Sequence, residues 1–578
     1  MVYNHSSFLP SSQKELDQRG WKNVDIILFS GDAYVDHPSF GIAVIGRVLE
    51  SEGYRVAIVP QPNWQDDLRD FKKLGAAKLF FGVSSGNMDS MVNHYTAAKR
   101  LRSNDAYTPQ GRAGARPDRA VTIYTRILKQ LYPNIPVVIG GIEASLRRLG
   151  HYDYWEDRWK SSILIESGAD YLVYGMGEQT ITEIALKMRN KATIKEIRRT
   201  PQIVWFDSEG TLNEIHQKVV MLKSYQECVQ KKEACIHNHS IIEREANKTA
   251  PSVLVEPVSN GNVVVNPPYP VMTSSALDAI YDLPFTRLPH PRYKGKEIPA
   301  YEMIKHSICL HRGCFGGCSF CSIAVHQGKQ ITSRSEESIL REVGALVRLP
   351  NFTGVISDLG GPSANMYGMG GKNVTRCNSC SRTSCLYPAL CPNLDHQHTH
   401  LTELYRKVRK EPGVRHAFVG SGIRYDLFLD EDGFLSQDGF TYFKELLRHH
   451  VSGSLKVAPE HTQPHVLHYM GKPSFRLFER FKACFDQLNT QENLKLLLVP
   501  YFISSHPGCT QKDMAALSQK LHAHQMVLEQ VQDFTPTPMT RSSVMFHTGK
   551  ALKTEKELFV ERDNTLKNKQ KSYFIKKS

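Results

Sequence analysis

Three cysteines lie close together near the middle of the chain. They are Cys314, Cys318 and Cys321, in the sequence HRGCFGGCSFC. Thiolates at this C-x3-C-x2-C spacing can hold three irons of a [4Fe–4S] cluster and leave the fourth iron open to another ligand. The intervening glycines let a short loop wrap closely around a cluster. The alternatives are thiols that only pack, or a zinc site completed by His311 or Cys309.

A second group of four cysteines has the form C-x2-C-x4-C-x5-C. Its members are Cys377, Cys380, Cys385 and Cys391. Four thiolates at this density can close a zinc site or hold an auxiliary iron–sulfur cluster, and we favour a metal over reduced cysteines that only pack. The histidines that follow, at positions 396, 398 and 400, are either alternative ligands or an ordinary surface turn.

The composition is that of a globular protein with several domains. The chain has 578 residues, of which 41% are hydrophobic and 22% charged, so two or three domains are expected. Neither a run of about 18 apolar residues nor a signal peptide is found, which predicts a cytoplasmic protein without membrane segments. In that compartment, grouped cysteines favour metal ligation over disulfides. The net charge of +14 is spread through the chain, which is compatible with nucleic-acid binding but does not indicate it.

Short apolar runs alternate with helical patterns in the first third of the chain. The runs are residues 25–34, 55–62, 78–86, 136–141 and 171–176. Buried strands separated by helices predict a parallel sheet covered on both faces, so we expect a doubly wound α/β domain over residues 1–190. Ligands of such domains bind at the carboxyl ends of the strands. The arginine-rich segment 86–119 can grip phosphate or carboxylate groups, or be an ordinary solvated surface.

A second series of strands and helices follows a proline-rich stretch. Residues 191–300 have a weak pattern, which predicts an irregular region and a linker. The strands expected beyond it are residues 303–310, 354–361, 416–422, 454–461, 494–505 and 530–536. Repeated strand–helix units predict a (β/α)6 partial barrel over residues 301–535, with the second cysteine group in an insertion at 362–400. The first cysteine group then follows the first barrel strand, at the functional edge.

The C-terminal part, residues 536–578, is expected to extend beyond the barrel. Its last fifteen residues hold five lysines and no acidic residue. Such a stretch predicts a disordered basic tail with weak affinity for polyanions.

The first cysteine motif, with an aromatic residue before its third cysteine, resembles the signature of radical S-adenosylmethionine (SAM) enzymes. The wider sequence resembles the YgiQ-type (UPF0313-like) branch of that superfamily. The resemblance implies that the open iron binds SAM, and that the reduced cluster splits it to give a 5′-deoxyadenosyl radical that abstracts hydrogen from a substrate. It also implies an external electron donor of the flavodoxin or ferredoxin type.

The same resemblance places further residues beside SAM. Phe320 is expected to cover the cluster, and Gly360 and Gly361 to meet the SAM amino group through their carbonyls. Arg424 and Glu460 are expected to meet the SAM carboxylate and ribose, although either can instead form a salt bridge at the barrel rim.

The N-terminal domain resembles the cobalamin-binding-like domain that precedes many radical SAM cores. A D-x-H-x-x-G loop often supplies an axial histidine there. Here the corresponding stretch, Asp36 to Gly41, reads DHPSFG and does not match that motif. We therefore do not expect cobalamin, and we expect the domain to bind a substrate or a partner.

Three functions fit these observations. The leading one is a radical SAM enzyme with an unidentified substrate. The second is an RNA-modifying, methylthiotransferase-like radical SAM enzyme, which the positive net charge favours although no RNA-binding domain is recognisable. The third is a protein that keeps an iron–sulfur cluster for sensing or structure without catalysis.

Overall fold

The chain folds as two compact units in a computed structural model that describes residues 7–524, 526 and 531–574. Unit 1 comprises Met1–Glu245, Ala250–Pro270 and Ala279–Lys305, and unit 2 comprises Ala246–Thr249, Val271–Asp278 and His306–Ser578. Each unit has its own hydrophobic core. Within the described ranges, none of the helices is long and apolar enough to cross a bilayer.

Unit 1 is built on a nine-stranded sheet in the order β10-β11-β12-β9-β8-β5-β4-β1-β3. The strands of unit 1 are β1 (Ile26–Ser30), β2 (Val35–Asp36), β3 (Val56–Pro60), β4 (Phe80–Ser84), β5 (Val137–Gly140), β6 (His151–Asp153), β7 (Arg158–Lys160), β8 (Tyr171–Val173), β9 (Ile203–Asp207), β10 (Val219–Met221), β11 (Val253–Val258), β12 (Gly261–Val265) and β13 (Leu288–Pro289). The helices are α1 (Gln13–Gln18), α2 (Gly41–Ser51), α3 (Arg69–Lys72), α4 (Ser90–His94), α5 (Ala120–Leu131), α6 (Gly141–Leu146), α7 (Ile163–Ser167), α8 (Glu178–Arg189), α9 (Ile194–Arg198), α10 (Tyr225–Gln230), α11 (Lys232–Ala246) and α13 (Pro299–Ile304). Helix α12 (Ser274–Tyr281) is divided between the units, with residues 274–278 in unit 2.

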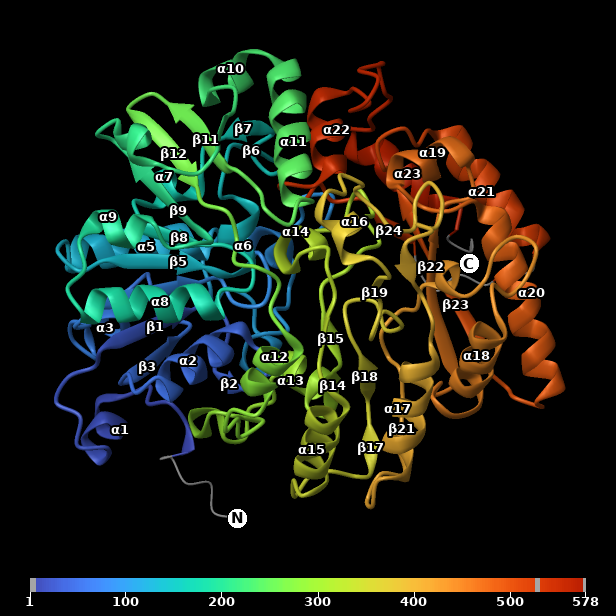
Figure 1. Ribbon diagram of the computed structural model, residues 1–578, viewed down its shortest axis with the longest axis horizontal. Helices are drawn as coiled ribbons and strands as arrows, with labels where there is room; N and C mark the ends of the chain where they lie inside the picture. Colours follow the sequence, from blue (N-terminus) through green and yellow to red (C-terminus); the bar gives the residue numbers. More distant parts are fainter. Residues whose placement is uncertain (1–6, 525, 527–530, 575–578) are drawn as a thin grey trace. The chain divides into compact units, whose positions relative to one another are not determined.

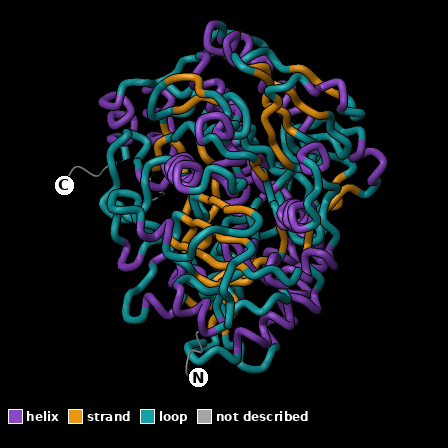
Figure 2. The backbone as a smooth tube through the Cα atoms, turned by 90° about the vertical axis from the view of Figure 1, so that its left-hand side faces the viewer, coloured by secondary structure: helices purple, strands orange, loops and turns teal. Residues whose placement is uncertain are grey.

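The five strands β3, β1, β4, β5 and β8 are parallel neighbours in this sheet. Every residue of β1 and β3 is buried, which requires cover on both faces. Helix α2 packs against α8, and α5 packs against α7. In Figure 2 the strands, in orange, lie among the surrounding helices, in purple. Unit 1 is therefore a doubly wound α/β domain, and all five apolar runs predicted as strands lie in its parallel part.

The region predicted to be irregular is the main difference from the expected fold. Strands β9, β10, β11 and β12 extend the sheet of unit 1 beyond β8 (Figure 1). β11 and β12 form an antiparallel hairpin, in which Val258 pairs with Gly261 and Ser259-Asn260 form the turn. A two-residue turn is the commonest hairpin connection. Pro257 lies within β11, and proline within a run argues against a strand. Part of the expected linker is also ordered, because β13 pairs with β2.

Glu256 is a buried acid in β11 of this extension. Its Oε2 accepts a hydrogen bond of 2.8 Å from the Gly150 amide, and burial raises the pKa of the carboxyl from 4.5 to about 7. The folded protein therefore holds the proton more tightly than the unfolded chain. The stability that this group contributes is complete below about pH 4.5 and is lost as the pH rises to about 7.

We therefore expect Glu256→Gln to make unit 1 more stable above neutral pH. The amide can accept the Gly150 hydrogen bond without carrying a charge, so the variant should gain about 3 kcal/mol at pH 8 and little at pH 4.5. Urea unfolding at both pH values measures the difference. Parallel curves of stability against pH for the two proteins would contradict this expectation.

Unit 2 begins with the strand that precedes the first cysteine group. Its strands are β14 (Ser307–Cys309), β15 (His311–Arg312), β16 (Thr332–Ser333), β17 (Val355–Ile356), β18 (Asp358–Gly360), β19 (Gly370–Gly371), β20 (Leu394–Asp395), β21 (His416–Ala417), β22 (Ser454–Glu460), β23 (Leu497–Ser504) and β24 (Val531–Asp533). Its helices are α14 (Ile323–Gln327), α15 (Glu336–Val347), α16 (Val374–Asn378), α17 (Thr399–Lys410), α18 (Gln437–His449), α19 (Pro464–Met470), α20 (Phe475–Gln491), α21 (Gln511–Ala523), α22 (Arg541–Thr548) and α23 (Asn564–Ser572).

Six parallel strand segments of unit 2 neighbour one another in the order of the chain. β14 pairs with β18, β17 with β21, β22 with β23 and β23 with β24. A parallel bridge from Ile423 to Val457 connects the third segment to β22. Helices α15, α17, α18, α20 and α21 fall between or after these strands and pack on the core. Unit 2 is therefore the expected (β/α)6 partial barrel, whose strand ends meet at one edge.

The prediction that the last fifteen residues are disordered is wrong for most of them. Residues 564–572 form helix α23, in which Lys567 is 1% exposed and Gln570 is fully buried. The Gln570 amide oxygen accepts a hydrogen bond of 2.8 Å from the Ser505 backbone amide, at the end of β23. Tertiary contacts thus outweigh the charge pattern. Residues 575–578 lie outside the described residues.

Candidate functional site

The first cysteine group lies on a loop at the carboxyl edge of the barrel. β15 and β16 pair antiparallel and close the base of this loop. Cys314, Cys318 and Cys321 are partly buried. The charge of Cys318 acts on both of the other thiols, and burial raises their pKa values, that of Cys321 to about 12. We call residues 313–322 the cysteine loop.

Arg424 binds directly to the cysteine loop. Its Nη1 donates to Cys318 Sγ at 3.3 Å, while Nε and Nη2 donate to the two carboxylate oxygens of Asp426 at 2.9 and 2.5 Å. The guanidinium is buried, with 8% of the residue exposed. Burial alone would raise the pKa of Asp426, but Arg424 more than offsets this and lowers it. Three of the five guanidinium N–H donors are used by these contacts, so two remain for a ligand.

The other predicted SAM residues lie at neighbouring strand ends. Glu460 ends β22, and its charge acts on Cys321. Burial raises the pKa of this carboxyl, while Lys472, whose Nζ is 3.7 Å from Oε1, opposes the rise. Phe320 packs edge-on against His506, with ring centroids 6.2 Å apart.

Gly360 ends β18 and Gly361 follows it, in a crowded part of the rim. The Gly360 carbonyl accepts a hydrogen bond of 2.7 Å from the Leu310 amide. A Cβ on Gly361 would lie 2.4 Å from the ring of His311, so only glycine fits there. His311 itself is fully buried, and neither ring nitrogen has a hydrogen-bond partner among the described residues. Burial lowers the pKa of this imidazole to about 4, so it is neutral at pH 7.

The C-terminal extension also contacts the cysteine loop. Arg541 donates to the Gly317 carbonyl, and the Ser542 amide donates to the Ser319 carbonyl at 3.0 Å. The hydroxyls of Ser319 and Ser542 are 2.8 Å apart. Sequence reasoning missed these contacts, because their partners are 224 residues apart for Arg541 and Gly317. No local pattern carries that information.

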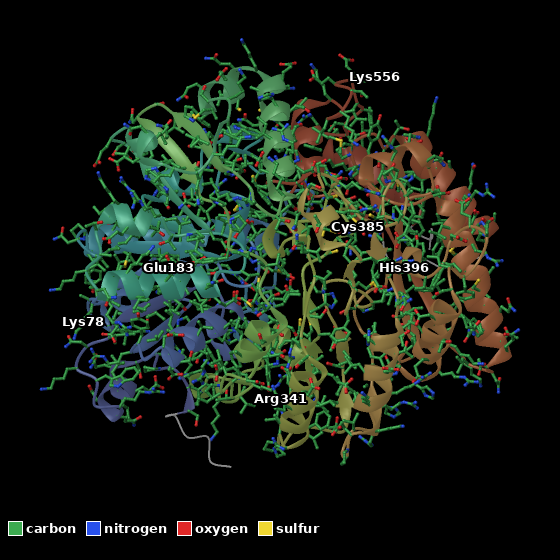
Figure 3. All side chains as sticks on the ribbon, in the orientation of Figure 1. Lys78, Glu183, Arg341, Cys385, His396 and Lys556 are labelled. Atoms are coloured by element: carbon green, nitrogen blue, oxygen red, sulfur yellow. The ribbon has the colours of Figure 1, made fainter. Side chains whose placement is uncertain are left out.

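The second cysteine group lies against the cysteine loop. The Cys385 amide donates to the Phe315 carbonyl at 3.1 Å, and the Ser384 hydroxyl donates to the Gly316 carbonyl at 2.8 Å. The side chains of Cys314, Cys385 and Cys391 pack on one small hydrophobic cluster centred on Phe315. The charges of Cys391 and Cys380 also act on the Cys385 thiol, which is labelled in Figure 3. The two cysteine groups are therefore neighbours in unit 2.

The geometry of a single metal ion is not present in either group. Across the described residues, no set of three or more His, Cys, Asp or Glu side chains is arranged to hold one ion. An iron–sulfur cube is larger than one ion, so its ligands surround it without converging on a point. The cysteine loop, with three adjacent thiols, glycines and a neighbouring cation, fits such a cluster better than it fits zinc.

Two of the histidines after the second cysteine group, His396 and His398, have structural roles, whereas His400 is exposed. His398 is 1% exposed, and its ring stacks on Tyr442 with centroids 4.2 Å apart. His396 Nδ1 lies 3.0 Å from the Leu427 carbonyl. The sequence left two alternatives for His398, a metal ligand or part of a surface turn. In the structure it is a core residue.

The loop at residues 36–41, which was compared with the cobalamin-binding motif, buries its first two side chains. Asp36 is fully buried and pairs with Arg47, whose Nε donates to Oδ1 at 3.0 Å. His37 is also fully buried, and its Nδ1 accepts a hydrogen bond of 3.0 Å from the Ser39 amide. Both side chains thus stabilise the loop between β2 and α2.

The comparisons with known proteins agree with this arrangement. The family model described as "Radical SAM N-terminal" matches residues 8–307. A UPF0313 protein from Bacteroides thetaiotaomicron is 53% identical over 99% of this chain and 94% of its own length. The chain belongs to the UPF0313 family of radical SAM proteins. A UPF0313 protein from Methanosarcina acetivorans is 44% identical over 98% of this chain and 78% of its own length.

A solved structure shares the fold of this UPF0313 chain. It is the radical SAM methyltransferase TsrM from Kitasatospora setae, described with cobalamin and a [4Fe–4S] cluster bound. The likeness covers 90% of this chain and 74% of that chain, with a TM-score of 0.50 and 16% sequence identity. At this identity the likeness supports the fold and carries no ligand over.

Proposed function

We propose that this protein is a radical SAM enzyme, in which Cys314, Cys318 and Cys321 hold a [4Fe–4S] cluster that cleaves SAM. The observation that carries the proposal is the contact between Arg424 and Cys318 at the barrel edge. A buried cation hydrogen-bonded to a ligand sulfur fits an iron–sulfur site, because hydrogen bonds to the cysteine sulfurs tune such clusters. When bound, the cluster supplies the electron that splits SAM into methionine and a 5′-deoxyadenosyl radical, which abstracts hydrogen from the substrate.

The neighbouring residues of unit 2 would position SAM. Gly360 and Gly361 would meet its amino group through their carbonyls, and the two remaining N–H donors of Arg424 can bind its carboxylate. Glu460 can accept the ribose hydroxyls, provided that it is ionised, which Lys472 favours. Phe320 shields one side of the loop from water. An external flavodoxin- or ferredoxin-type protein would supply the electron.

Anaerobic reconstitution with iron and sulfide, followed by reduction in the presence of SAM, tests the proposal. Formation of 5′-deoxyadenosine supports the enzyme. A reconstituted, reduced protein that leaves SAM intact would instead favour an iron–sulfur sensing or structural protein. The RNA-modifying alternative predicts transfer of deuterium between labelled 5′-deoxyadenosine and RNA.

We also propose a metal at the second cysteine group. Its support is the position of Cys385 and Cys391 against the Phe315 cluster, beside the cysteine loop. An auxiliary iron–sulfur cluster at this place would lie beside the cysteine loop and could accept an electron from a substrate radical. Zinc would only brace the insertion.

Replacing both Cys377 and Cys380 with alanine is expected to remove this metal, because two of its four ligands are lost. Iron and zinc contents, measured after reconstitution, should fall by about one zinc or one cluster per chain while the three-cysteine site stays loaded. Cys484→Ala, a buried cysteine on α20, is the control. Equal metal contents in all three proteins would exclude a second site.

The absence of cobalamin remains a prediction. The inward positions of Asp36 and His37 support it, since neither can reach a ligand at the sheet edge without opening the loop. Incubation with hydroxocobalamin followed by gel filtration tests it, and co-elution at one equivalent would overturn it.

A further inference from the structure

Unit 1 contains a pocket that the cysteine chemistry does not use. Its volume is about 470 Å³, which suits a small organic ligand. Its lining includes Trp64, His94, Tyr95, Arg102, Arg116 and Asp118. These residues come mainly from the loops that follow β3 and β4, at the carboxyl ends of parallel strands. This is the edge where doubly wound domains bind their ligands.

His94 in the pocket lining forms a hydrogen bond through one ring nitrogen, and its other ring nitrogen has no partner among the described residues. His94 Nδ1 lies 2.8 Å from Asp118 Oδ1, and the Tyr95 hydroxyl donates to Asp118 Oδ2 at 2.7 Å. The hydrogen bond from His94 is the largest cause of the lowered pKa of Asp118, which is therefore ionised. A carboxylate can only accept, so Nδ1 carries the proton and Nε2 has a free lone pair when the ring is neutral.

The Nε2 atom of His94 is unsatisfied. His94 is 8% exposed, and Nε2 is buried without a hydrogen-bond partner among the described residues. A buried polar atom in this state costs free energy unless a ligand or water supplies a partner. A ligand with an N–H or O–H donor would satisfy it.

The buried Arg116 holds the pocket in shape, and its Nη2 also pairs with Asp32 Oδ1 at 3.0 Å. Arg116 is 1% exposed, and its Nε and Nη2 donate to the carboxylate of Asp105 at 3.0 and 3.1 Å. Its Nη1 donates to the Ser85 carbonyl at 2.8 Å, after β4. These bonds fix the long loop of residues 95–119 to the sheet edge. The site is therefore formed before a ligand arrives, which reduces the entropy lost on binding.

The remaining lining residues indicate the chemistry of the ligand. Trp64 and Tyr95 offer aromatic faces on which a planar ring can stack. Arg102 is exposed, and no ion pair is found for it among the described residues. Its guanidinium is available for a phosphate or carboxylate. The pocket thus combines surfaces for a flat ring, a hydrogen-bond donor and an anion.

We propose that this pocket binds a planar heteroaromatic molecule with an anionic group, the chemistry of a nucleotide. The ring stacks on Trp64 and donates a hydrogen bond to His94 Nε2, and the phosphate pairs with Arg102. The free mononucleotide and a nucleotide within RNA share this chemistry. The site lies wholly in unit 1 and does not depend on the function proposed for unit 2.

Binding of AMP and GMP to the full chain tests the proposal. Saturable binding is measured by calorimetry and by quenching of tryptophan fluorescence, with adenosine, guanosine and inorganic phosphate as separate probes. A mononucleotide should bind about tenfold or more tightly than its nucleoside, because the nucleoside lacks the anion. A single-stranded oligoribonucleotide that displaces the bound mononucleotide would identify RNA as the source, and failure to displace it would identify the free nucleotide.

Two variants separate the pocket from general surface charge. Arg102→Ala should weaken mononucleotide binding about tenfold and leave nucleoside binding unchanged. Arg100→Ala, an equally exposed arginine outside the pocket lining, is the matched control and should change binding less than about twofold. His94→Gln should weaken both nucleotide and nucleoside. No saturable binding of AMP or GMP, or equal effects of the two arginine substitutions, would overturn the proposal.

Discussion

Cys318→Ala is expected to abolish SAM cleavage, by about a thousandfold or more, and to prevent stable cluster assembly. Cys318 is the middle ligand of the proposed cluster, and its sulfur is the one that Arg424 contacts. Two thiolates do not hold an iron–sulfur cube, so the loss should be of the cluster itself. The measurements are iron content, the absorbance of the reconstituted protein near 400 nm, and 5′-deoxyadenosine formation.

The matched control is Cys484→Ala, which removes a buried thiol elsewhere in unit 2. This variant should assemble the cluster and cleave SAM at close to the rate of the native protein. Cleavage that survives Cys318→Ala would refute the assignment of the three ligands, and so would a similar loss in both variants.

The second large effect is expected from breaking the buried pair of Arg424 and Asp426. Arg424→Ala leaves the Asp426 carboxylate buried without its cation, which should cost unit 2 about 3–5 kcal/mol of stability. The exposed pair of Lys482 and Asp486 on α20 is the comparison, and Lys482→Ala should cost less than about 1 kcal/mol. Urea unfolding of both variants without the cluster measures these costs.

A double substitution separates stability from cluster binding. Arg424→Met with Asp426→Leu replaces the ion pair by apolar side chains of similar length, which should recover most of the lost stability. It should not recover iron binding if the hydrogen bond from Arg424 to Cys318 Sγ helps to hold the cluster. Recovery of both would show that Arg424 has only a structural role. A single-variant cost below 1 kcal/mol would show that the pair is not buried in solution.

The parallel strands of both units were predictable because burial on two faces leaves a strong sequence pattern. β1, with the sequence IILFS, has no exposed residue, and such runs stand out from their polar surroundings. The hairpin of β11 and β12, which turns at Ser259-Asn260, was missed. The pattern over residues 191–300 is weak and its later part is rich in proline, which predicted a linker, and only pairing with β9 makes this segment part of the sheet.

The candidate site was predictable where its residues are local in sequence. The spacing of Cys314, Cys318 and Cys321 is readable without a structure. The pairing of Arg424 with Asp426, two positions later, could have been suspected, but its contact with Cys318 crosses 106 residues. Helix α23 shows the same limit, because the partners that bury Gln570 come from the end of β23. Tertiary contacts of this kind leave no periodic trace.

The contacts of Arg541 and Ser542 with the cysteine loop join two segments that the ribosome synthesises at different times. The ribosome makes Gly317 224 residues before Arg541, which corresponds to about 10–45 seconds at ordinary rates of elongation. During this interval the loop exists without the side chains that later hold its carbonyls. The proposed cluster, if delivered during this interval, would sit on an unsupported loop. We therefore expect cluster loading to follow release of the complete chain from the ribosome.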